Sequence, residues 1–174
     1  GIDLAGEGGM VWSKFRSAAE MHEIVDSERG ETGTCYDVVH SNNTNAQNTS
    51  YSWGITSFNS NGFSLNGNNR QFNGAGDVGY ASWTFRKAPG FFDVVTYSGN
   101  DVAGRGIAHN LGSVPGCIIV KAYSADADWH VYHRSVGTGK FLTLNSTSAT
   151  TTNAGSFSTT PTSTETSSTT ITEF

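Results

Sequence analysis

Two stretches of the chain, Gly9-Met10-Val11-Trp12-Ser13-Lys14 and Gly116-Cys117-Ile118-Ile119-Val120-Lys121, follow one pattern of a glycine, a short apolar run and a lysine. Each is followed by a polar linker that contains Ser-Ala, and then by a second apolar segment, residues 21–25 in the first case and 129–133 in the second. Short apolar runs bounded by glycines are typical of strands. The pattern therefore predicts two equivalent pairs of strands about 107 residues apart.

The resemblance between the two regions continues in the same order through a glycine turn, an apolar strand and a tract rich in Asn, Ser and Thr. The matched segments are 35–38 with 141–144, 41–50 with 145–153, and 55–58 with 171–174. We therefore predict an all-β chain, an antiparallel β-sandwich of jelly-roll or concanavalin A-like type, built as a tandem repeat of one unit. Residues 1–90 would form the first unit, incomplete at its start, and residues 91–174 the second, incomplete at its end. The chain would then be one part of a longer array of such units.

The alternation of side chains supports strands elsewhere. Residues 80–86 place Trp83 and Phe85 on one face, as the two-residue period of a strand requires. Segments 91–97 and 106–111 are separated by glycines and predict a hairpin. The Asn-Gly pairs within 59–62 and 66–69 predict tight turns, because Asn and Gly tolerate positive φ.

The composition restricts the function. Charged residues make up 14% of the chain, and the formal net charge is −5. Phosphate binding needs a basic stripe, so we predict no nucleic-acid partner. No apolar run approaches the ~20 residues of a membrane span, so we predict no membrane insertion. The two cysteines, Cys35 and Cys117, fit either two small buried hydrophobic side chains or one disulfide.

No catalytic or metal-binding motif is present in the sequence. It contains neither a nucleophile elbow nor a phosphate-binding loop. His130 and His133 are three residues apart on a predicted strand and therefore point to opposite faces, which disfavours a shared metal. We predict no enzyme activity, no metal and no cofactor. The alternative function is a glycan-degrading enzyme, which would need a pair of carboxylates. The candidates are Asp26, Glu28, Glu31, Asp77, Asp93, Asp126 and Asp128.

Carbohydrate recognition fits the residue types better than catalysis does. An aromatic face can bind the apolar side of a sugar ring, while Asn and Asp side chains can hydrogen-bond the hydroxyl groups. The opposing interpretation is that the tryptophans belong to the core. The predicted binding residues are Trp53, Asn59, Asn61, Asn68, Asp126 and Trp129.

Residues 55–65, 80–95 and 107–121 are similar to a repeat found in structural proteins of marine bacteriophages. The resemblance covers nearly the whole chain, and 91–121 is its most specific part. It implies a concanavalin A-like domain of a tail fibre or another virion protein, located at the virion surface or tail after synthesis in the host cytoplasm. It also implies other virion proteins, further copies of this chain and host-surface carbohydrate as partners. It implies no catalytic residues. A purely architectural head decoration or tail component is the alternative.

Overall fold

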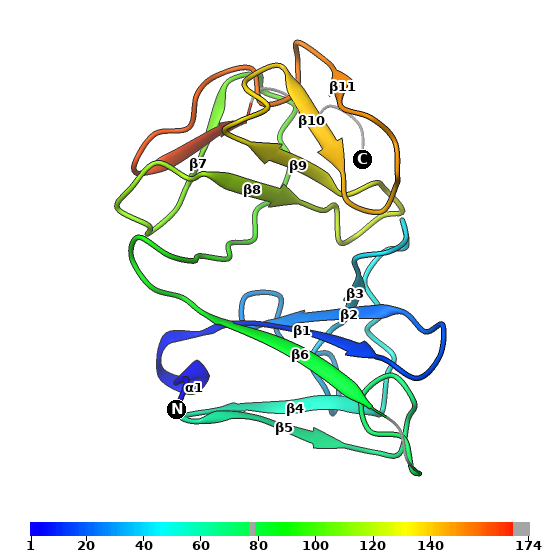
Figure 1. The fold of residues 1–174 in the computed structure, drawn as a ribbon. Coiled ribbons are helices and arrows are strands. Elements are labelled where there is room, and N and C mark those ends of the chain that lie inside the picture. The colour runs from blue at the N-terminus through cyan, green and yellow to red at the C-terminus, as the bar shows by residue number, and fades with distance from the viewer. Residues whose placement is uncertain (77–78, 169–174) are drawn as a thin grey trace.

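The computed structural model describes residues 1–76 and 79–168, which form two stacked halves made almost wholly of antiparallel strands (Figure 1). This confirms the predicted all-β, sandwich-like fold. The elements in chain order are α1 (Leu4–Glu7), β1 (Gly9–Phe15), β2 (His22–Asp26), β3 (Val39–His40), β4 (Gly54–Asn59), β5 (Gly62–Asn66), β6 (Tyr80–Arg86), β7 (Arg105–Ala108), β8 (Cys117–Val120), β9 (His130–His133), β10 (Lys140–Thr143), β11 (Thr151–Thr152) and β12 (Glu165–Ser168).

Each half contains one four-stranded sheet and one pair of strands. The first half combines the sheet β3-β2-β1-β6 with the hairpin β4-β5, and the second combines β11-β10-β9-β8 with the pair β12-β7. In Figure 1 the hairpin β4-β5 lies beneath the first four-stranded sheet, and the second four-stranded sheet lies above the first. The described strands therefore form stacked layers, with one four-stranded sheet facing the other.

β1 shows why the layers pack on both of its faces. Its residues alternate between buried and half-buried, with Val11 and Phe15 almost fully enclosed. Val11 packs toward the β4-β5 hairpin, whereas Trp12 packs toward the second half. Gly9 begins the strand, where an added Cβ would lie 2.2 Å from the carbonyl oxygen of Phe85. Only glycine allows β6 to approach so closely.

Three apolar clusters form the core. The first joins the β4-β5 hairpin to the first sheet around Ile55, Phe58 and Val25. The second lies between the two halves and is centred on Trp129. The third lies on the far face of the second sheet around Phe141. Apolar burial therefore runs through the stack and joins the halves as well as stabilising each one.

The strand pair β8-β9 repeats the register of β1-β2. Met10 pairs with Asp26 in the first hairpin and Cys117 with His133 in the second, so both partners move by 107 residues. The other pairs of β8-β9 obey the same shift. This relationship shows that the two hairpins are equivalent in pairing, as the sequence pattern predicts.

Side-chain contacts beside these hairpins are also equivalent. The Nζ of Lys14 donates to the carbonyl oxygens of Phe15, Ala18 and Glu20 at 2.6, 3.4 and 3.2 Å. The Nζ of Lys121 donates to those of Ala122 and Ala125 at 2.8 and 3.2 Å. In both linkers, a lysine ammonium therefore holds the backbone of the turn.

An asparagine contact extends the equivalence by one strand. The Oδ1 of Asn42 accepts the backbone N–H of His22 at 2.9 Å, and the Oδ1 of Asn145 accepts that of Trp129 at 2.9 Å. The remaining strand pairs of the two halves differ: β4 and β5 are consecutive strands, whereas β12 and β7 are far apart in the chain. Duplication of a complete unit, with a boundary at residue 90, therefore stays a prediction, and its last segment, 171–174, lies outside the described residues.

One local prediction is wrong, one element was not predicted, and one prediction is half right. Residues 91–97 contain no strand, and β7 pairs instead with the distant β12 through Ile107 and Thr166. The short helix α1 is an addition, begun by the carboxylate of Asp3, which accepts the N–H of Gly6 at 2.9 Å. Both cysteines are free; Cys35 is buried, as predicted, but Cys117 is exposed.

Candidate functional site

A pocket of about 360 Å³ lies between the two halves. Glu28 and Lys87 line it from the first half, whereas Tyr97 and Arg105 line it from the second. It combines charged groups, an aromatic ring and backbone of the edge strand β7. Pockets of this size with a few converging polar groups are where small ligands bind. The pocket is therefore the candidate site.

Lys87 is the central polar group of this site. Its Nζ lies 2.8 Å from Oε1 of Glu28 and 3.2 Å from Oδ1 of Asp93. The side chains of Lys87 and Glu28 are 21% and 34% exposed, whereas that of Asp93 is only 5% exposed. Burial alone would lower the pKa of Lys87, but the hydrogen bonds that its ammonium donates to both carboxylates, together with their charges, outweigh burial and raise the pKa. The ammonium therefore stays charged and bridges two carboxylates.

Asp93 fixes the segment that follows β6. One of its oxygens contacts Lys87, and the other accepts the backbone N–H of Asn110 at 2.7 Å. Asn110 lines the pocket just after β7. Since a buried carboxylate must be paired, this arrangement ties residues 93 and 110 together at the pocket wall.

The opposite wall consists of Tyr97 and Arg105. The guanidinium carbon of Arg105 lies 5.8 Å from the centroid of the Tyr97 ring, within cation–π distance. Arg105 also donates to the carbonyl oxygen of Ser98. Burial raises the pKa of Tyr97 despite the opposing effect of the Arg105 charge, so the phenol stays protonated and able to donate.

The six predicted binding residues do not come together at this pocket. Trp129 is a correction: it is 5% exposed, and its indole N–H donates to the carbonyl oxygen of His40 at 2.9 Å, so its ring belongs to the core. Trp53 stacks on Tyr51, with the two ring centroids 3.8 Å apart, beside the first core cluster. The Trp129 ring is therefore enclosed, while Tyr51 covers one face of the half-buried Trp53 ring.

Three of the four polar members of the predicted set form hydrogen bonds with other parts of the chain. Asn59 donates to the hydroxyl of Ser64 at 2.9 Å, Asn68 accepts the N–H of Ala75 at 3.0 Å, and Asp126 accepts that of Ala46 at 2.8 Å. Asn61 is exposed in the turn between β4 and β5. These residues shape three separate loops instead of one site.

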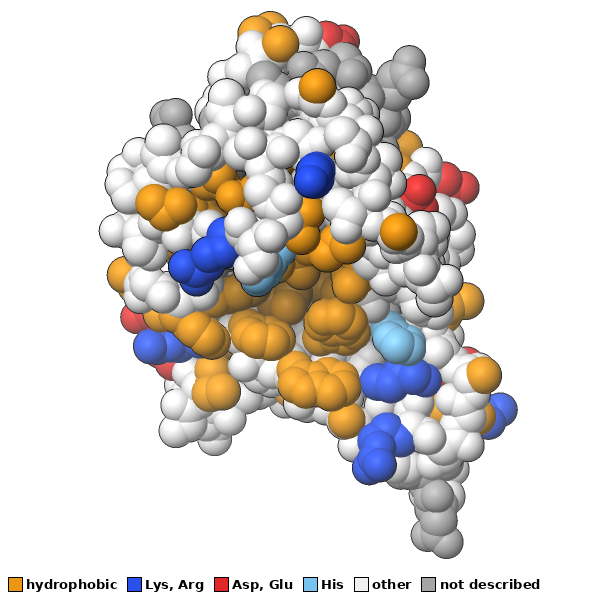
Figure 2. All heavy atoms as spheres, turned by 45° about the horizontal axis from the view of Figure 1, so that its top comes forward, with side chains coloured by type: hydrophobic (Ala, Val, Ile, Leu, Met, Phe, Trp, Pro, Cys, Tyr) orange, Lys and Arg blue, Asp and Glu red, His pale blue; other side chains and the backbone are white. Residues whose placement is uncertain are grey.

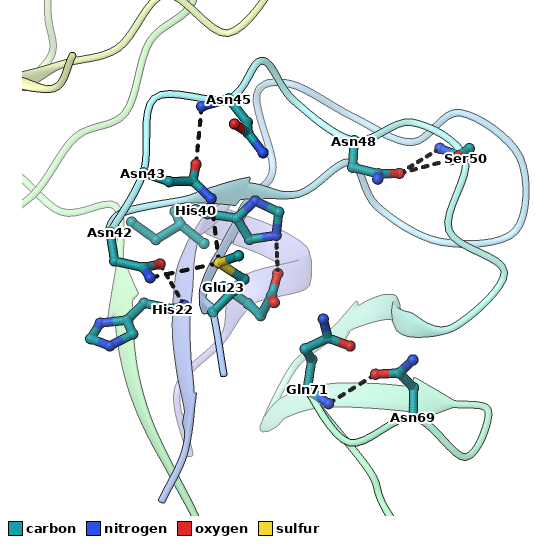
Figure 3. A network of polar contacts seen from close by, with 12 residues as sticks. His22, Glu23, His40, Asn42, Asn43, Asn45, Asn48, Ser50, Asn69 and Gln71 are labelled. Atoms are coloured by element: carbon teal, nitrogen blue, oxygen red, sulfur yellow. Dashed lines mark hydrogen bonds and ion pairs between the residues drawn. The ribbon is translucent and has the colours of Figure 1, made fainter. Parts of the chain in front are cut away.

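A second polar feature lies inside the first half. Nε2 of His40 is 3.0 Å from Oε2 of Glu23, and Glu23 is fully buried (Figure 3). Figure 3 shows the pair on neighbouring strands next to a loop rich in asparagine, whose Asn42 holds His22. Because the pair is enclosed, it links β2 to β3 and offers no accessible group to a ligand.

The sequence did not predict this pocket, because none of the six predicted binding residues lines it. Glu28, which lines it, and Asp93, which contacts Lys87, were named only as candidate carboxylates of the alternative, a glycan-degrading enzyme. Lys87, Tyr97 and Arg105 carried no local signal. Asp77, another candidate, lies outside the described residues. Residues 1–76 and 79–168 contain no group of three His, Cys, Asp or Glu side chains able to hold a metal. In the same ranges, no helix is long and apolar enough to cross a membrane.

No curated protein and no solved structure matches the chain. A family model does match nearly all of it, residues 3–173. The description of that family gives no activity. On this match, the chain belongs to the family described as domain of unknown function DUF7483.

Proposed function

We propose that this chain is a non-enzymatic structural domain of a bacteriophage virion surface protein and that it binds host-surface carbohydrate in the pocket between its halves. The virion setting rests on the sequence resemblance to phage structural proteins. The carbohydrate site rests on one observation: Lys87, Glu28, Arg105 and Tyr97 converge on a pocket of about 360 Å³. This location replaces the loop residues expected from the sequence.

The residue types suit a ligand with many hydroxyl groups. Glu28 offers acceptors, Arg105 offers donors, and the Tyr97 hydroxyl does both. Val95 adds apolar surface to the wall. Such a mixture of hydrogen-bonding groups with apolar and aromatic surface is how proteins bind sugars and orient them.

The contacts of Lys87 favour binding over hydrolysis. Glycoside hydrolysis needs one carboxyl group that carries a proton and can give it to the leaving oxygen. Of the carboxylates Glu28 and Asp93, only Glu28 lines the pocket, because Asp93 is 5% exposed, and both contact the ammonium of Lys87, at 2.8 and 3.2 Å. The pair therefore suits recognition rather than acid catalysis.

A glycan array with the purified chain tests the carbohydrate site. Tyr97→Ala and Arg105→Ala should each weaken any detected binding about tenfold or more, a loss of about 1.4 kcal/mol. Lys140→Ala is the matched control, because Lys140 is exposed on β10 and does not line the pocket. Binding that is unchanged in both pocket variants would rule out this pocket. Release of reducing sugars from host polysaccharide would instead identify an enzyme.

Immunolabelling of virions that contain the chain tests its location. Labelling of the outer surface or tail of intact particles is the expected result. If the label appears only after the capsid is opened, the chain is internal and the surface assignment fails.

A further inference from the structure

The outer edge of β8 has no strand partner among residues 1–76 and 79–168. The backbone N–H of Arg134 donates to the carbonyl oxygen of Gly116 at 2.9 Å, so Gly116 bonds toward β9. Antiparallel strands alternate in bonding direction, so Ile118 and Val120 also bond toward β9, while Cys117 and Ile119 point their N–H and C=O groups outward. β8 therefore presents an open row of donors and acceptors.

The equivalent edge in the first half is covered. β1 corresponds to β8, and β6 pairs with its outer edge from Gly9↔Arg86 to Phe15↔Tyr80. The described part of the second half has no strand in the position that β6 takes beside β1. The outer edge of β8 is therefore equivalent to the edge of β1 that pairs with β6.

β6 also has a free edge. The N–H of Lys87 donates to the carbonyl oxygen of Gly8 at 3.0 Å, and that of Arg16 to Gly79 at 2.8 Å, so the odd-numbered residues of β6 bond toward β1. Ser82 and Thr84 therefore point their backbone groups away from β1. Among the strand edges of the described residues, those of β6 and β8 thus lie one in each half and carry no strand partner.

Apolar side chains accompany both edges. Trp83 is 51% exposed, Ile119 48% and Phe91 67%. Figure 2 shows hydrophobic side chains gathered in a hollow between the halves. β8 contains no proline and no charged residue, which are the usual means of protecting an edge strand. An edge of this kind is suited to pairing with a strand of another chain.

We infer that a second copy of this chain covers the edge of β8: β6 of each copy pairs with β8 of the other around a two-fold axis. Such an interface satisfies both open edges at once and is self-complementary, as a two-fold dimer requires. It also buries Trp83 and Ile119 of both copies. The inference goes beyond the proposed carbohydrate binding and does not depend on it.

Proline substitutions test the pairing, because each removes one outward N–H and leaves the inner ladder intact. Ile119→Pro acts on β8 and Thr84→Pro acts on β6. The wild-type chain should form a concentration-dependent dimer in sedimentation and light-scattering measurements, and either substitution should raise the dimer dissociation constant tenfold or more. Ile119→Lys is a second β8 variant that should do the same. Circular dichroism checks that every variant is folded.

The control and the contrary outcomes are distinct. Val102→Lys adds the same charge at a loop position that is 58% exposed, and it should leave the dimer unchanged. Dissociation by the β8 variants but not by Thr84→Pro would show that β8 pairs with β8, which overturns the inference. A wild-type monomer up to about millimolar concentration would overturn it too.

Cys117 supplies an independent measurement, since it is exposed on β8 while Cys35 is buried. Dimer formation should slow its labelling by a maleimide several-fold at high protein concentration. A labelling rate that does not change as the dimer forms would contradict pairing at this edge.

Discussion

The indole N–H of Trp129 donates to the backbone carbonyl oxygen of His40 across 2.9 Å, and this buried bond joins the second half of the molecule to the first. Trp129 also packs against Ile24 and Val39 in the cluster between the two sheets. One side chain therefore provides both apolar and polar contact where the halves meet.

Replacing Trp129 with Phe should lower the free energy of unfolding by about 1–3 kcal/mol, because the carbonyl oxygen of His40 loses its donor in a buried setting. Urea unfolding measures the change. Trp83→Phe is the control, since Trp83 is 51% exposed, and it should change stability much less. Equal losses in the two variants would show that the buried bond has no special weight.

The Glu23–His40 pair should show strong coupling in a double-mutant cycle. His40→Leu leaves the buried carboxyl group of Glu23 without its polar neighbour at 3.0 Å, which should cost about 1–3 kcal/mol. Adding Glu23→Leu removes the unpartnered buried polar group and should restore much of that loss, because both partners are then apolar. Additive losses measured by urea unfolding would contradict the coupling.

The chain should lose stability in mild acid. Burial lowers the pKa of His130 despite the opposing charge of Asp128, and burial together with Lys14 lowers that of His22. The unfolded chain therefore takes up protons first, so the contribution of each histidine is complete above about pH 6.5 and is lost as pH falls through the folded pKa. Thermal unfolding between about pH 7.5 and pH 5 should follow this trend.

A histidine variant isolates the effect. His130 stacks on Phe141 with ring centroids 4.1 Å apart. His130→Gln should be less stable at neutral pH, but its stability should fall less on acidification than that of the wild type. His133→Gln, at an exposed position at the end of β9, should keep the wild-type pH profile. If the two variants respond alike, His130 is not the group responsible.

Lys14→Met and Lys121→Met should each lower the free energy of unfolding by about 1.5–3 kcal/mol, since each removes three bonds from an ammonium to carbonyl oxygens. Lys121 also reaches the carbonyl oxygen of Thr44 in the first half at 3.0 Å, so its loss should additionally loosen the junction of the halves. Calorimetry measures both changes. The exposed Lys140→Met serves as control, and a loss of the same size there would contradict the assigned role.

The sequence predicted those parts of the fold that depend on local pattern. Alternation in 80–86 identified β6, and the matched glycine-to-lysine segments identified two hairpins. The match of 21–25 with 129–133 is one residue away from the equivalence that the pairing of the strands shows. The predicted hairpin of 91–111 failed because β7 pairs with residues 165–168, far along the chain. Strand pairing is decided by tertiary contacts that local propensity does not contain.

The pocket was not predicted from the sequence, for a related reason. Glu28 and Lys87 are distant in sequence and meet only because Lys87 follows β6, which lies beside β1. Trp129 was misassigned because a tryptophan next to a polar linker has the same local sequence whether its ring is open or buried. Its partner, the carbonyl oxygen of His40, carries no sequence signal at all.

The two lysine-held linkers have a consequence for how sequences of this family can vary. In each linker the turn is held by the ammonium of one side chain and not by a particular turn sequence, so most linker residues are free to change in type. Linker length is different, because inserted residues would carry the carbonyl oxygens beyond the reach of Lys14 or Lys121. Natural variation at these two linkers should therefore consist of substitutions, with insertions accompanied by loss of the lysine.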